Sequence, residues 1–336
     1  MKAISLLSGG LDSILAAKLI IGQNIDVEAV YFHTPFCDCN MPQASCKISR
    51  KSADLLKVPF HKVELEEEFL DMVRNPKHGY GKNINPCIDC RIMQFKKAKE
   101  LMRELGAGFI ITGEVLNERP MSQRRPAMEN IDKEAGVQGL ILRPLSAKML
   151  KETMPEKEGV VDRKKLLDIE GRSRKRQIEL AKFYGIGEYL TPSGGCLLTY
   201  AGSSDKVRDL IKYSQLTMAH ARLLKLGRHF RLDEKAKFIV GKDDAENERI
   251  SAIKESGAIF LNAQDFPGPM GVLPDGGSKE SVELAASVLA YYVNKAGDAQ
   301  SLNIAYRVSG GETKGSIAVT KITKPLLDGL RVTRQI

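Results

Sequence analysis

Short apolar runs alternate with longer amphipathic segments through the first 200 residues of the chain. The runs have the length of buried strands, and the segments between them have the 3.6-residue period of helices. Strands are predicted at about residues 2–7, 27–32, 60–64, 108–112 and 140–143. Helices are predicted at about residues 11–21, 42–56, 88–105 and 172–184. This order predicts βαβ units, and therefore an α/β fold in which a parallel sheet has helices on both faces.

The pattern changes after Tyr200. Residues 205–225 read as a basic helix and linker, and an α+β module follows from Gly227. Its predicted elements are strands near 238–241, 258–262, 302–308 and 316–323 and a helix near 278–294. We therefore expect three segments: a domain at 1–200, a basic helical linker at 201–226 and a C-terminal α+β domain at 227–336.

Two polar, charged stretches interrupt the first domain. They cover residues 114–139 and 151–165. Loops of such length are usually functional or disordered. Each stretch is expected to be either a mobile flap or a solvated insertion.

The turn Ser8-Gly9-Gly10-Leu11-Asp12-Ser13 joins the first predicted strand to the first predicted helix. A helix that begins at Leu11 leaves backbone N–H groups unpaired at its N-terminus, where the helix dipole favours an anion. Adjacent glycines let a phosphate approach the backbone closely, and Ser8 and Ser13 add hydroxyl donors. No lysine follows, so this is not a Walker-type loop. The alternative is a Gly-Gly turn without a ligand.

Two cysteines at C-x-x-C spacing form the second signal, in Asn85-Pro86-Cys87-Ile88-Asp89-Cys90. Cys90 lies at the predicted start of a helix, where the dipole lowers the pKa of a thiol. A third cysteine, Cys196, follows two glycines. Three thiolates can hold a [4Fe–4S] cluster and leave one iron open. A reactive dithiol without metal and a set of buried cysteines are the alternatives.

A second group of cysteines, Cys37, Cys39 and Cys46, follows the second predicted strand. It could bind zinc, supply other cluster ligands or pack as apolar side chains. The residues alone do not rank these three interpretations.

The net positive charge of the chain indicates the kind of molecule that it binds. The formal net charge is +9 and the calculated pI is about 9.1, which fits a polyanionic partner such as nucleic acid. A solvated basic surface would have the same composition. No apolar run approaches a membrane span, and no cleaved signal precedes the first strand, so we expect a cytoplasmic protein without a membrane partner. In that compartment, cysteines favour metal or redox chemistry over structural disulfides.

Together these motifs resemble the tRNA thiolation branch of the PP-loop ATP pyrophosphatase family, in particular the tRNA 4-thiouridine synthetases and the related tRNA 2-thiouridylases. Ser8 to Ser13 is similar to their pyrophosphate loop. Thr112-Gly113-Glu114 with Ser122-Gln123 is similar to the T-G-E…S-Q stretch of the 4-thiouridine enzymes, and Ile141 to Leu145 to their next strand. Cys87 stands where the 2-thiouridylases have an Asp. The resemblance covers about residues 1–200.

The resemblance implies an adenine nucleotide α-hydrolase-like fold and a tRNA sulfurtransferase that forms AMP and pyrophosphate. The ATP-binding residues would be Ser8, Gly9, Gly10, Leu11, Asp12, Ser13, Phe32, Thr112 and Gly113. Asp12 would hold Mg²⁺ or orient the loop, although a helix N-terminal carboxylate has the same placement. Cys90 and Cys196 match the catalytic cysteines. With Cys87 they would hold a [4Fe–4S] cluster that carries sulfide, or Cys196 would carry a persulfide that Cys90 resolves.

The C-terminal part resembles an RNA-binding domain of the NFACT type. The resemblance lies in Gly227 to Phe230, Val240-Gly241-Lys242, Asp265 to Pro269, Ala285 to Leu289 and Lys321 to Pro325. It implies that the domain docks tRNA. The expected phosphate contacts are Arg222, Lys225, Arg228, His229, Arg231 and Lys242.

The expected function is ATP-dependent thiolation of a tRNA uridine, with 4-thiouridine as the favoured product and 2-thiouridine as the alternative. The expected sulfur donor is sulfide or a product of a cysteine desulfurase, because no rhodanese-type carrier domain is recognisable. A homodimer is left open as the assembly. The competing functions are another adenylating PP-loop enzyme and a non-catalytic RNA-binding protein regulated by ATP.

Overall fold

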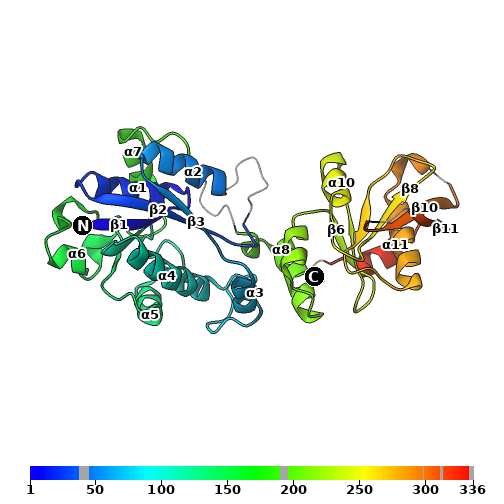
Figure 1. Cartoon of the computed structure of the whole chain (residues 1–336), viewed down its shortest axis with the longest axis horizontal. Coiled ribbons are helices and arrows are strands. Elements are labelled where there is room, and N and C mark those ends of the chain that lie inside the picture. The colour runs from blue at the N-terminus through cyan, green and yellow to red at the C-terminus, as the bar shows by residue number, and fades with distance from the viewer. Residues whose placement is uncertain (38–44, 190–195, 298, 311–312, 333–336) are drawn as a thin grey trace. The chain divides into compact units, whose positions relative to one another are not determined.

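The chain folds as two compact units in the computed structural model, Met1–Thr199 and Tyr200–Ile336. The structure describes residues 1–37, 45–189, 196–297, 299–310 and 313–332. Each unit is built around a sheet of its own (Figure 1). Among the described residues, no helix is both long enough and apolar enough to cross a membrane.

The first unit contains a parallel sheet of five strands in the order β3-β2-β1-β4-β5. The strands are β1 (Lys2–Leu6), β2 (Asp26–His33), β3 (Phe60–Glu64), β4 (Phe109–Thr112) and β5 (Ile141–Leu142). The helices are α1 (Leu11–Ile21), α2 (Ser45–Leu56), α3 (Glu67–Arg74), α4 (Cys87–Glu104), α5 (Arg125–Glu134), α6 (Met154–Lys157) and α7 (Lys175–Phe183). This architecture confirms the predicted α/β fold.

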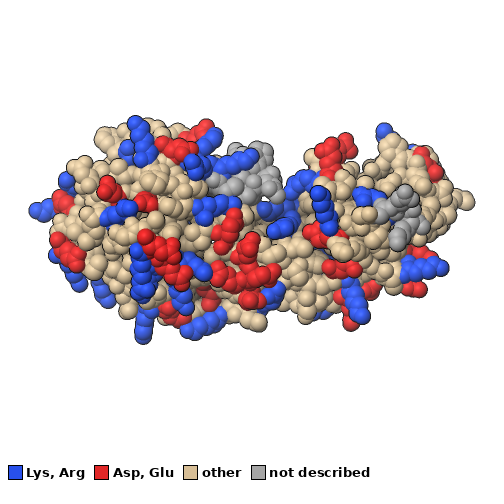
Figure 2. Space-filling view, in the orientation of Figure 1, with Lys and Arg blue, Asp and Glu red and all other residues tan. Residues whose placement is uncertain are grey.

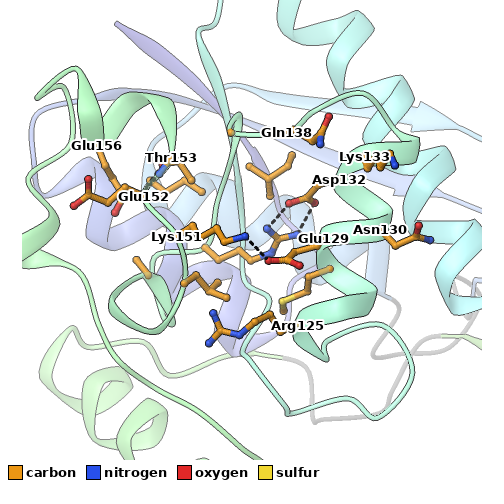
Figure 3. Close-up of a pocket in the computed structure, with 17 residues that line it drawn as sticks. Arg125, Glu129, Asn130, Asp132, Lys133, Gln138, Lys151, Glu152, Thr153 and Glu156 are labelled. Carbon is orange, nitrogen blue, oxygen red and sulfur yellow. Dashed lines mark hydrogen bonds and ion pairs between the residues drawn. The ribbon is translucent and has the colours of Figure 1, made fainter.

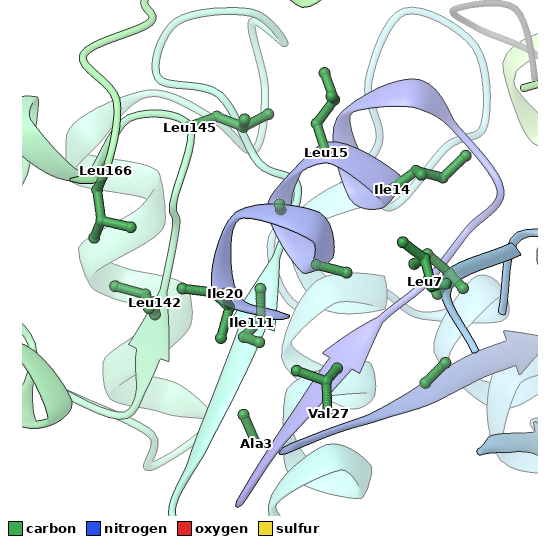
Figure 4. Packing of buried hydrophobic residues seen from close by; sticks show 14 of the residues in the cluster. Ala3, Leu7, Ile14, Leu15, Ile20, Val27, Ile111, Leu142, Leu145 and Leu166 are labelled. Carbon is green, nitrogen blue, oxygen red and sulfur yellow. The ribbon is translucent and has the colours of Figure 1, made fainter. Parts of the chain in front are cut away.

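The apolar runs of the strands are continuous because both faces of the sheet are covered. In β1, Ala3 packs into the core around α1, whereas Ile4 and Leu6 pack into the core around α4 and α5. In β4, Ile111 packs into the core around α1, and Ile110 packs into the core around α4 and α5. Figure 4 shows the α1 core, in which α1 contributes residues from several sides. Parallel strands covered by helices on both faces typically carry such unbroken apolar sequences.

The strand order reverses at β1, with β2 and β3 on one side of it and β4 and β5 on the other. β1 and β4 pair although they are distant in sequence. Crevices beyond the carboxyl ends of strands at such a switch point are the usual ligand sites of this architecture. Gly113, directly after β4, brings that strand end against the first turn of α1. A Cβ at Gly113 would lie 2.4 Å from the Ser13 nitrogen and 2.5 Å from the Asp12 carbonyl carbon. Only glycine fits this approach.

The second unit has an antiparallel sheet of six strands in the order β11-β10-β8-β9-β7-β6. The strands are β6 (Arg228–Arg231), β7 (Lys237–Val240), β8 (Ile259–Ala263), β9 (Gly271–Leu273), β10 (Leu302–Val308) and β11 (Thr313–Val319). The helices are α8 (Ala201–Lys212), α9 (Met218–Leu223), α10 (Asp244–Ser251), α11 (Lys279–Tyr291) and α12 (Lys324–Leu330). Apolar residues of α11 pack on the sheet to form the core. The predicted C-terminal α+β domain is confirmed.

Several elements differ from the sequence prediction. The last strand ends at Val319, and Thr323, which the prediction included in it, is instead the N-cap of the helix α12. The stretch 114–139 is neither a flap nor a solvated insertion: it contains α5, and its Ser122 and Gln123 are buried. The predicted helix 42–56 is described only from Ser45, and its first part lies outside the described residues.

The residues expected to form a linker are largely helical. They contain α8 and α9. Asp209 of α8 forms ion pairs with Arg231 and with the buried Lys237 of the second sheet. These contacts make α8 a structural part of the second unit.

Replacing Gly113 by alanine tests the contact between β4 and α1. We expect Gly113→Ala to lower the free energy of unfolding by about 1–3 kcal/mol, the usual range for overpacking a tight contact. We also expect it to weaken ATP binding more than tenfold, because the first turn of α1 must move. Urea unfolding and calorimetric titration with ATP measure the two effects. The matched control is Gly187→Ala, where no atom lies within 4 Å of the added Cβ. Unchanged stability and affinity in Gly113→Ala would contradict the role given to this contact.

Candidate functional site

A cavity of about 340 Å³ lies beyond the carboxyl ends of β1, β2 and β4. It brings together most of the residues predicted from the sequence. From the predicted site it includes Ser8, Gly10, Asp12, Ser13, Phe32, Cys87, Cys90, Thr112, Gly113 and Cys196. Gly9 and Leu11 do not line it: Gly9 packs against Ser49 of α2, and Leu11 is buried in the core. We call this cavity the strand-end cavity.

The turn before α1 presents backbone N–H groups to the strand-end cavity. Gly10 is the N-cap of α1 and makes no side-chain capping hydrogen bond. The Ser8 hydroxyl accepts from Gly10 N at 3.3 Å, and the Ser13 hydroxyl donates to Gly10 O at 2.8 Å. Gly9 has a φ of +77°, which a residue with a side chain rarely adopts. An uncapped helix N-terminus beside two hydroxyls is a suitable site for a phosphate.

Charged side chains surround this turn. Arg174 Nη2 lies 3.2 Å from Asp12 Oδ2, and Arg174 Nε lies 4.0 Å from Glu118 Oε1. Burial raises the pKa of Asp12 above its usual value, against the opposing charges of Arg174 and Arg119. Burial, followed by the nearby Asp12 carboxylate, raises the pKa of Glu118 as well. Because Arg174 is already paired with two carboxylates, the positive charge for a polyphosphate here would come mainly from a metal ion bound with it.

Asp12 fits the expected role in Mg²⁺ binding. Its Oδ1 is buried and has no hydrogen-bond partner among the described residues. Magnesium is usually held by one or two carboxylates together with substrate phosphates. The unsatisfied oxygen beside the anion site is therefore a suitable ligand for Mg²⁺ bound with ATP.

Four cysteines line the same cavity: Cys37, Cys87, Cys90 and Cys196. The helix α4 begins at Cys87, so Cys90 lies inside its first turn and not at its start as predicted. Burial, followed by the proximity of Cys196, raises the pKa of Cys90 to about 12. The expected lowering of this pKa by the helix N-terminus is therefore wrong for the protein without a bound metal.

The cysteines supply the donor type that an iron–sulfur cluster needs, but not its geometry. Within the described ranges of the chain, no group of three or more His, Cys, Asp or Glu side chains is arranged to hold a metal ion. Cys39 lies outside the described residues, as does the side chain of Cys46, so the predictions for these two stay open. We derive no reaction step through a cluster.

A buried ion network supports one wall of the strand-end cavity. Glu114 is 2% exposed and lies 3.1 Å from Arg91 Nε and 2.9 Å from Arg143 Nε. Burial alone would raise the pKa of Glu114, but Arg91 and Arg143 hold it below its usual 4.5. Arg143 also donates two hydrogen bonds to Asp132, at 2.9 and 2.7 Å. The network fixes α4 and α5 to the end of β4.

A second cavity, of about 500 Å³, lies between α5 and the segment after β5 (Figure 3). Its charged lining is largely paired internally. Arg143 binds Asp132, and Lys151 lies 3.1 Å from Glu129. Although this cavity is larger, it contains neither the uncapped helix end nor a cysteine. We therefore place the candidate chemistry in the strand-end cavity.

Comparison with known proteins agrees with this geometry. Residues 1–164 match the family model of the tRNA methyl transferase HUP domain, and residues 227–328 match that of the NFACT protein RNA-binding domain. The tRNA-specific 2-thiouridylase MnmA of Syntrophotalea carbinolica is 36% identical over 115 residues. The chain is thus similar in sequence to tRNA-specific 2-thiouridylases. The match covers 32% of this chain and 32% of that relative, so the two share about a third of their lengths.

Solved structures give looser likenesses. A 4-thiouridine synthetase–RNA complex with bound ATP has 18% identity and a TM-score of 0.39, and the match covers 66% of this chain and 53% of the other. The U34-tRNA thiolase NcsA of Methanococcus maripaludis, with its [4Fe–4S] cluster, has 17% identity and a TM-score of 0.36. That match covers 67% of this chain and 73% of the other.

Two of the five short motifs that suggested the resemblance of the C-terminal domain lie on neighbouring strands. Gly227 precedes β6, and Val240 ends β7, which pairs with β6. Arg222 and Lys242 are exposed there, and Lys225 is half-buried. Arg228 lies over the Tyr292 ring at 4.7 Å and donates to Gly241 O at 3.0 Å. Both charge signs are interspersed over the face in Figure 2.

Two of the residues predicted to contact phosphate, His229 and Arg231, instead bind partners within the domain. His229 is 3% exposed and hydrogen-bonds to Leu226 O at 2.7 Å. Burial, followed by the charge of Lys206, lowers the pKa of His229 well below its usual value, so the ring is neutral. Arg231 donates two hydrogen bonds to Asp209, at 3.0 and 2.6 Å. We therefore omit both from the proposed RNA surface.

Sequence reasoning missed the charged residues that complete the site. Arg174, Glu118 and Arg91 line the strand-end cavity, but they occur in polar segments without a recognisable pattern. Cys37 was grouped with its sequence neighbours and not with the other three cysteines. Its position just after β2, at the same sheet edge as the phosphate loop, was the available signal.

Replacing Glu114 by glutamine tests the buried network. We expect Glu114→Gln to lower the free energy of unfolding by about 3–5 kcal/mol at pH 7, because two guanidinium groups lose a buried counter-charge. The pKa of Glu114 is lowered in the folded state, so its contribution is complete above its usual value of 4.5 and is lost as the pH falls through the folded value. The difference from wild type should therefore shrink in acid. Urea unfolding at several pH values measures it.

The control is Glu104→Gln at the exposed end of α4, for which we expect a change within about 0.5 kcal/mol. Equal effects of the two substitutions at pH 7 would show that the Glu114 network does not stabilise the unit.

Proposed function

We propose that this protein is an ATP-dependent enzyme that thiolates a uridine in tRNA. One observation carries the proposal: the uncapped N-terminus of α1 and three predicted cysteines line a single cavity. Adenylation needs the first feature and sulfur transfer needs the second. The relationship to tRNA thiolation enzymes supports the substrate class.

In the first step, the β and γ phosphates of ATP bind at the turn before α1. The uridine carbonyl oxygen attacks the α phosphorus, and the bond between the α and β phosphates breaks. Asp12 would hold Mg²⁺ through its Oδ1, and the metal would supply positive charge against the departing pyrophosphate, with Arg174 beside it. Phe32 and Gly113, which also line the cavity, are placed to contact the adenine. The product is an adenylated uridine.

In the second step, sulfur replaces the activated oxygen. The terminal sulfur of a persulfide on Cys196 attacks the adenylated carbon, and AMP leaves with the former carbonyl oxygen. A separate donor, such as a cysteine desulfurase with cysteine, supplies the persulfide sulfur. The closeness of the thiols to the phosphate loop allows both steps to occur on one bound base.

Two observations bear on which thiouridine is the product. The curated relatives are named 2-thiouridylases, which favours sulfur at position 2. The second candidate is 4-thiouridine, because Thr112, Ser122 and Gln123 of the 4-thiouridine-type motif line the cavity. Mass spectrometry of tRNA nucleosides separates the two isomers.

Replacing Cys196 by serine tests the sulfur step. We expect Cys196→Ser to lower thiouridine formation at least 100-fold, because the sulfur carrier is lost, while tRNA binding is unchanged. The assay contains anaerobically purified protein, ATP, Mg²⁺, tRNA and a cysteine desulfurase with cysteine, which loads Cys196 with sulfur at the persulfide level. Release of pyrophosphate by the variant is the internal control for adenylation, whereas AMP should stay bonded to the uridine because it leaves only when sulfur attacks.

The competing functions give other results. Pyrophosphate release without thiouridine in the wild type would indicate another adenylating enzyme, and tRNA binding without pyrophosphate release would indicate an ATP-regulated binding protein. Iron and sulfide analysis of the same preparation tests the cluster: about four irons per chain would show that Cys87, Cys90 and Cys196 hold one and would contradict the persulfide step.

Substitution of the exposed basic residues tests docking of tRNA by the NFACT-type domain. We expect Arg222→Ala with Lys242→Ala to weaken tRNA binding about tenfold and to reduce the slope of log affinity against log salt by about one to two, because two phosphate contacts are lost. Filter binding at several salt concentrations measures both. The matched control is Lys254→Ala, an exposed lysine of the same unit. Equal losses in the control and the double variant would contradict a localised RNA surface.

A further inference from the structure

Cys37 and Cys196 face each other across an isolated antiparallel bridge. Leu197 N donates to Phe36 O at 3.0 Å, so the hydrogen bond flanks the cysteine pair and does not lie within it. Residues of such a non-hydrogen-bonded antiparallel pair have Cα atoms about 4.5 Å apart. Disulfides usually join Cα atoms about 4.4–6.8 Å apart. The backbone pairing therefore puts the Cα atoms of these two cysteines within the range that a disulfide spans.

The surroundings of the pair place it within the strand-end cavity. Cys37 is 5% exposed, and its Sγ lies 2.8 Å from the Tyr31 hydroxyl, so it is held against the end of β2. Cys196 precedes a short 3₁₀ turn, Leu197–Thr199. Both cysteines line the cavity that also contains the turn before α1. Cys37 therefore lies where the sulfur chemistry takes place and is not a peripheral packing residue.

We propose that Cys37 is the thiol that releases the transferred sulfur from Cys196, with a Cys37–Cys196 disulfide as the protein product of each turnover. This inference rests on the proposed thiolation. It assigns the resolving role to Cys37 in place of Cys90, the partner that the resemblance implied. Cys90 also lies close to Cys196, but it is in the first turn of α4, where its Sγ accepts from Gln94 at 3.5 Å, and no backbone bridge joins it to Cys196 among the described residues.

The step balances in atoms and electrons. Attack by the persulfide on the adenylated uridine expels AMP and leaves the base joined to Cys196 through a disulfide. The Cys37 thiolate attacks Sγ of Cys196, the bond between Sγ and the base-bound sulfur breaks, and the electron pair leaves on that sulfur as thiouridine. The two cysteines are oxidised to a disulfide and the transferred sulfur is reduced. An external thiol or dithiol reductant restores both cysteines.

A redox titration tests the pair without any substrate. The full chain is equilibrated anaerobically in mixtures of reduced and oxidised glutathione, quenched with an alkylating agent and digested, and the linked peptides are identified by mass spectrometry. We expect Cys37–Cys196 to be the first intramolecular disulfide to form. Formation of Cys90–Cys196 instead, or of neither, would overturn the proposal even if thiolation itself is confirmed.

A single turnover then tests the role. Protein carrying the persulfide is mixed with ATP and tRNA in the absence of reductant. In the wild type, we expect one Cys37–Cys196 disulfide for each thiouridine released. In Cys37→Ser, we expect release to fall at least tenfold and a protein–tRNA adduct to accumulate, which dithiothreitol cleaves to thiouridine. Wild-type release rates without an adduct in Cys37→Ser would overturn the assignment.

The two tests separate failure of this inference from failure of the proposed function. Absence of thiouridine from the wild type with every donor would refute the function and remove the basis of the inference. Thiouridine formation linked to a Cys90–Cys196 disulfide would keep the function and refute only the role of Cys37. If Cys37→Ser does not fold, the glutathione titration of the wild-type chain still decides the pairing.

Discussion

The close approach of β4 to the first turn of α1 is the constraint on which the site depends. Parallel pairing of β1 with β4 brings two strand ends together that are separated by about 100 residues of sequence. The space left between them is too small for any side chain at Gly113. This contact fixes the direction of α1, and hence of the N–H groups that make the anion site. It also places the thiols carried by α4 on the other side of the same opening.

Buried ion pairs hold this arrangement together. Burying a charged side chain costs free energy, so the charged groups of the network are paired with one another. Transferring a carboxylate into the interior costs several kcal/mol, and only well-aligned partners offset that cost. Glu114 meets two guanidinium groups, and Arg143 also pairs with Asp132. Asp12 Oδ1 has no hydrogen-bond partner in the described part of the chain, and neither has Glu114 Oε1, although Arg91 Nε lies 3.1 Å from the latter. Glu114 is thus balanced by two cations, whereas Asp12 Oδ1 is the oxygen that we propose as a ligand for Mg²⁺.

The sequence was sufficient for the fold class, the five strands and the helices α1, α2, α4 and α7 of the first unit, because these signals are local, but it did not predict α3, α5 or α6. The apolar runs and the Gly-Gly turn each indicate the backbone conformation of the residues that form them. The elements β1, α1 and the C-x-x-C helix therefore fall within a residue or two of their predicted bounds. The ion network could not be predicted in this way. Arg91 and Arg143 resemble ordinary surface residues in sequence, and only the pairing of strands shows that they meet at Glu114. Likewise, Cys37 and Cys196 are distant in sequence, and a backbone bridge makes them neighbours.

The same distinction accounts for the basic residues of the second unit. A count of lysines and arginines predicts a nucleic-acid surface from net charge, but charge acts on a phosphate only where it is not already neutralised. Arg231 and Lys237 converge on Asp209, and burial removes the charge of His229 altogether. These residues stabilise the join between α8 and the sheet. Long-range attraction of tRNA would then depend on the remaining exposed cations, and specificity on how the bound RNA presents one uridine to the thiol and phosphate sites.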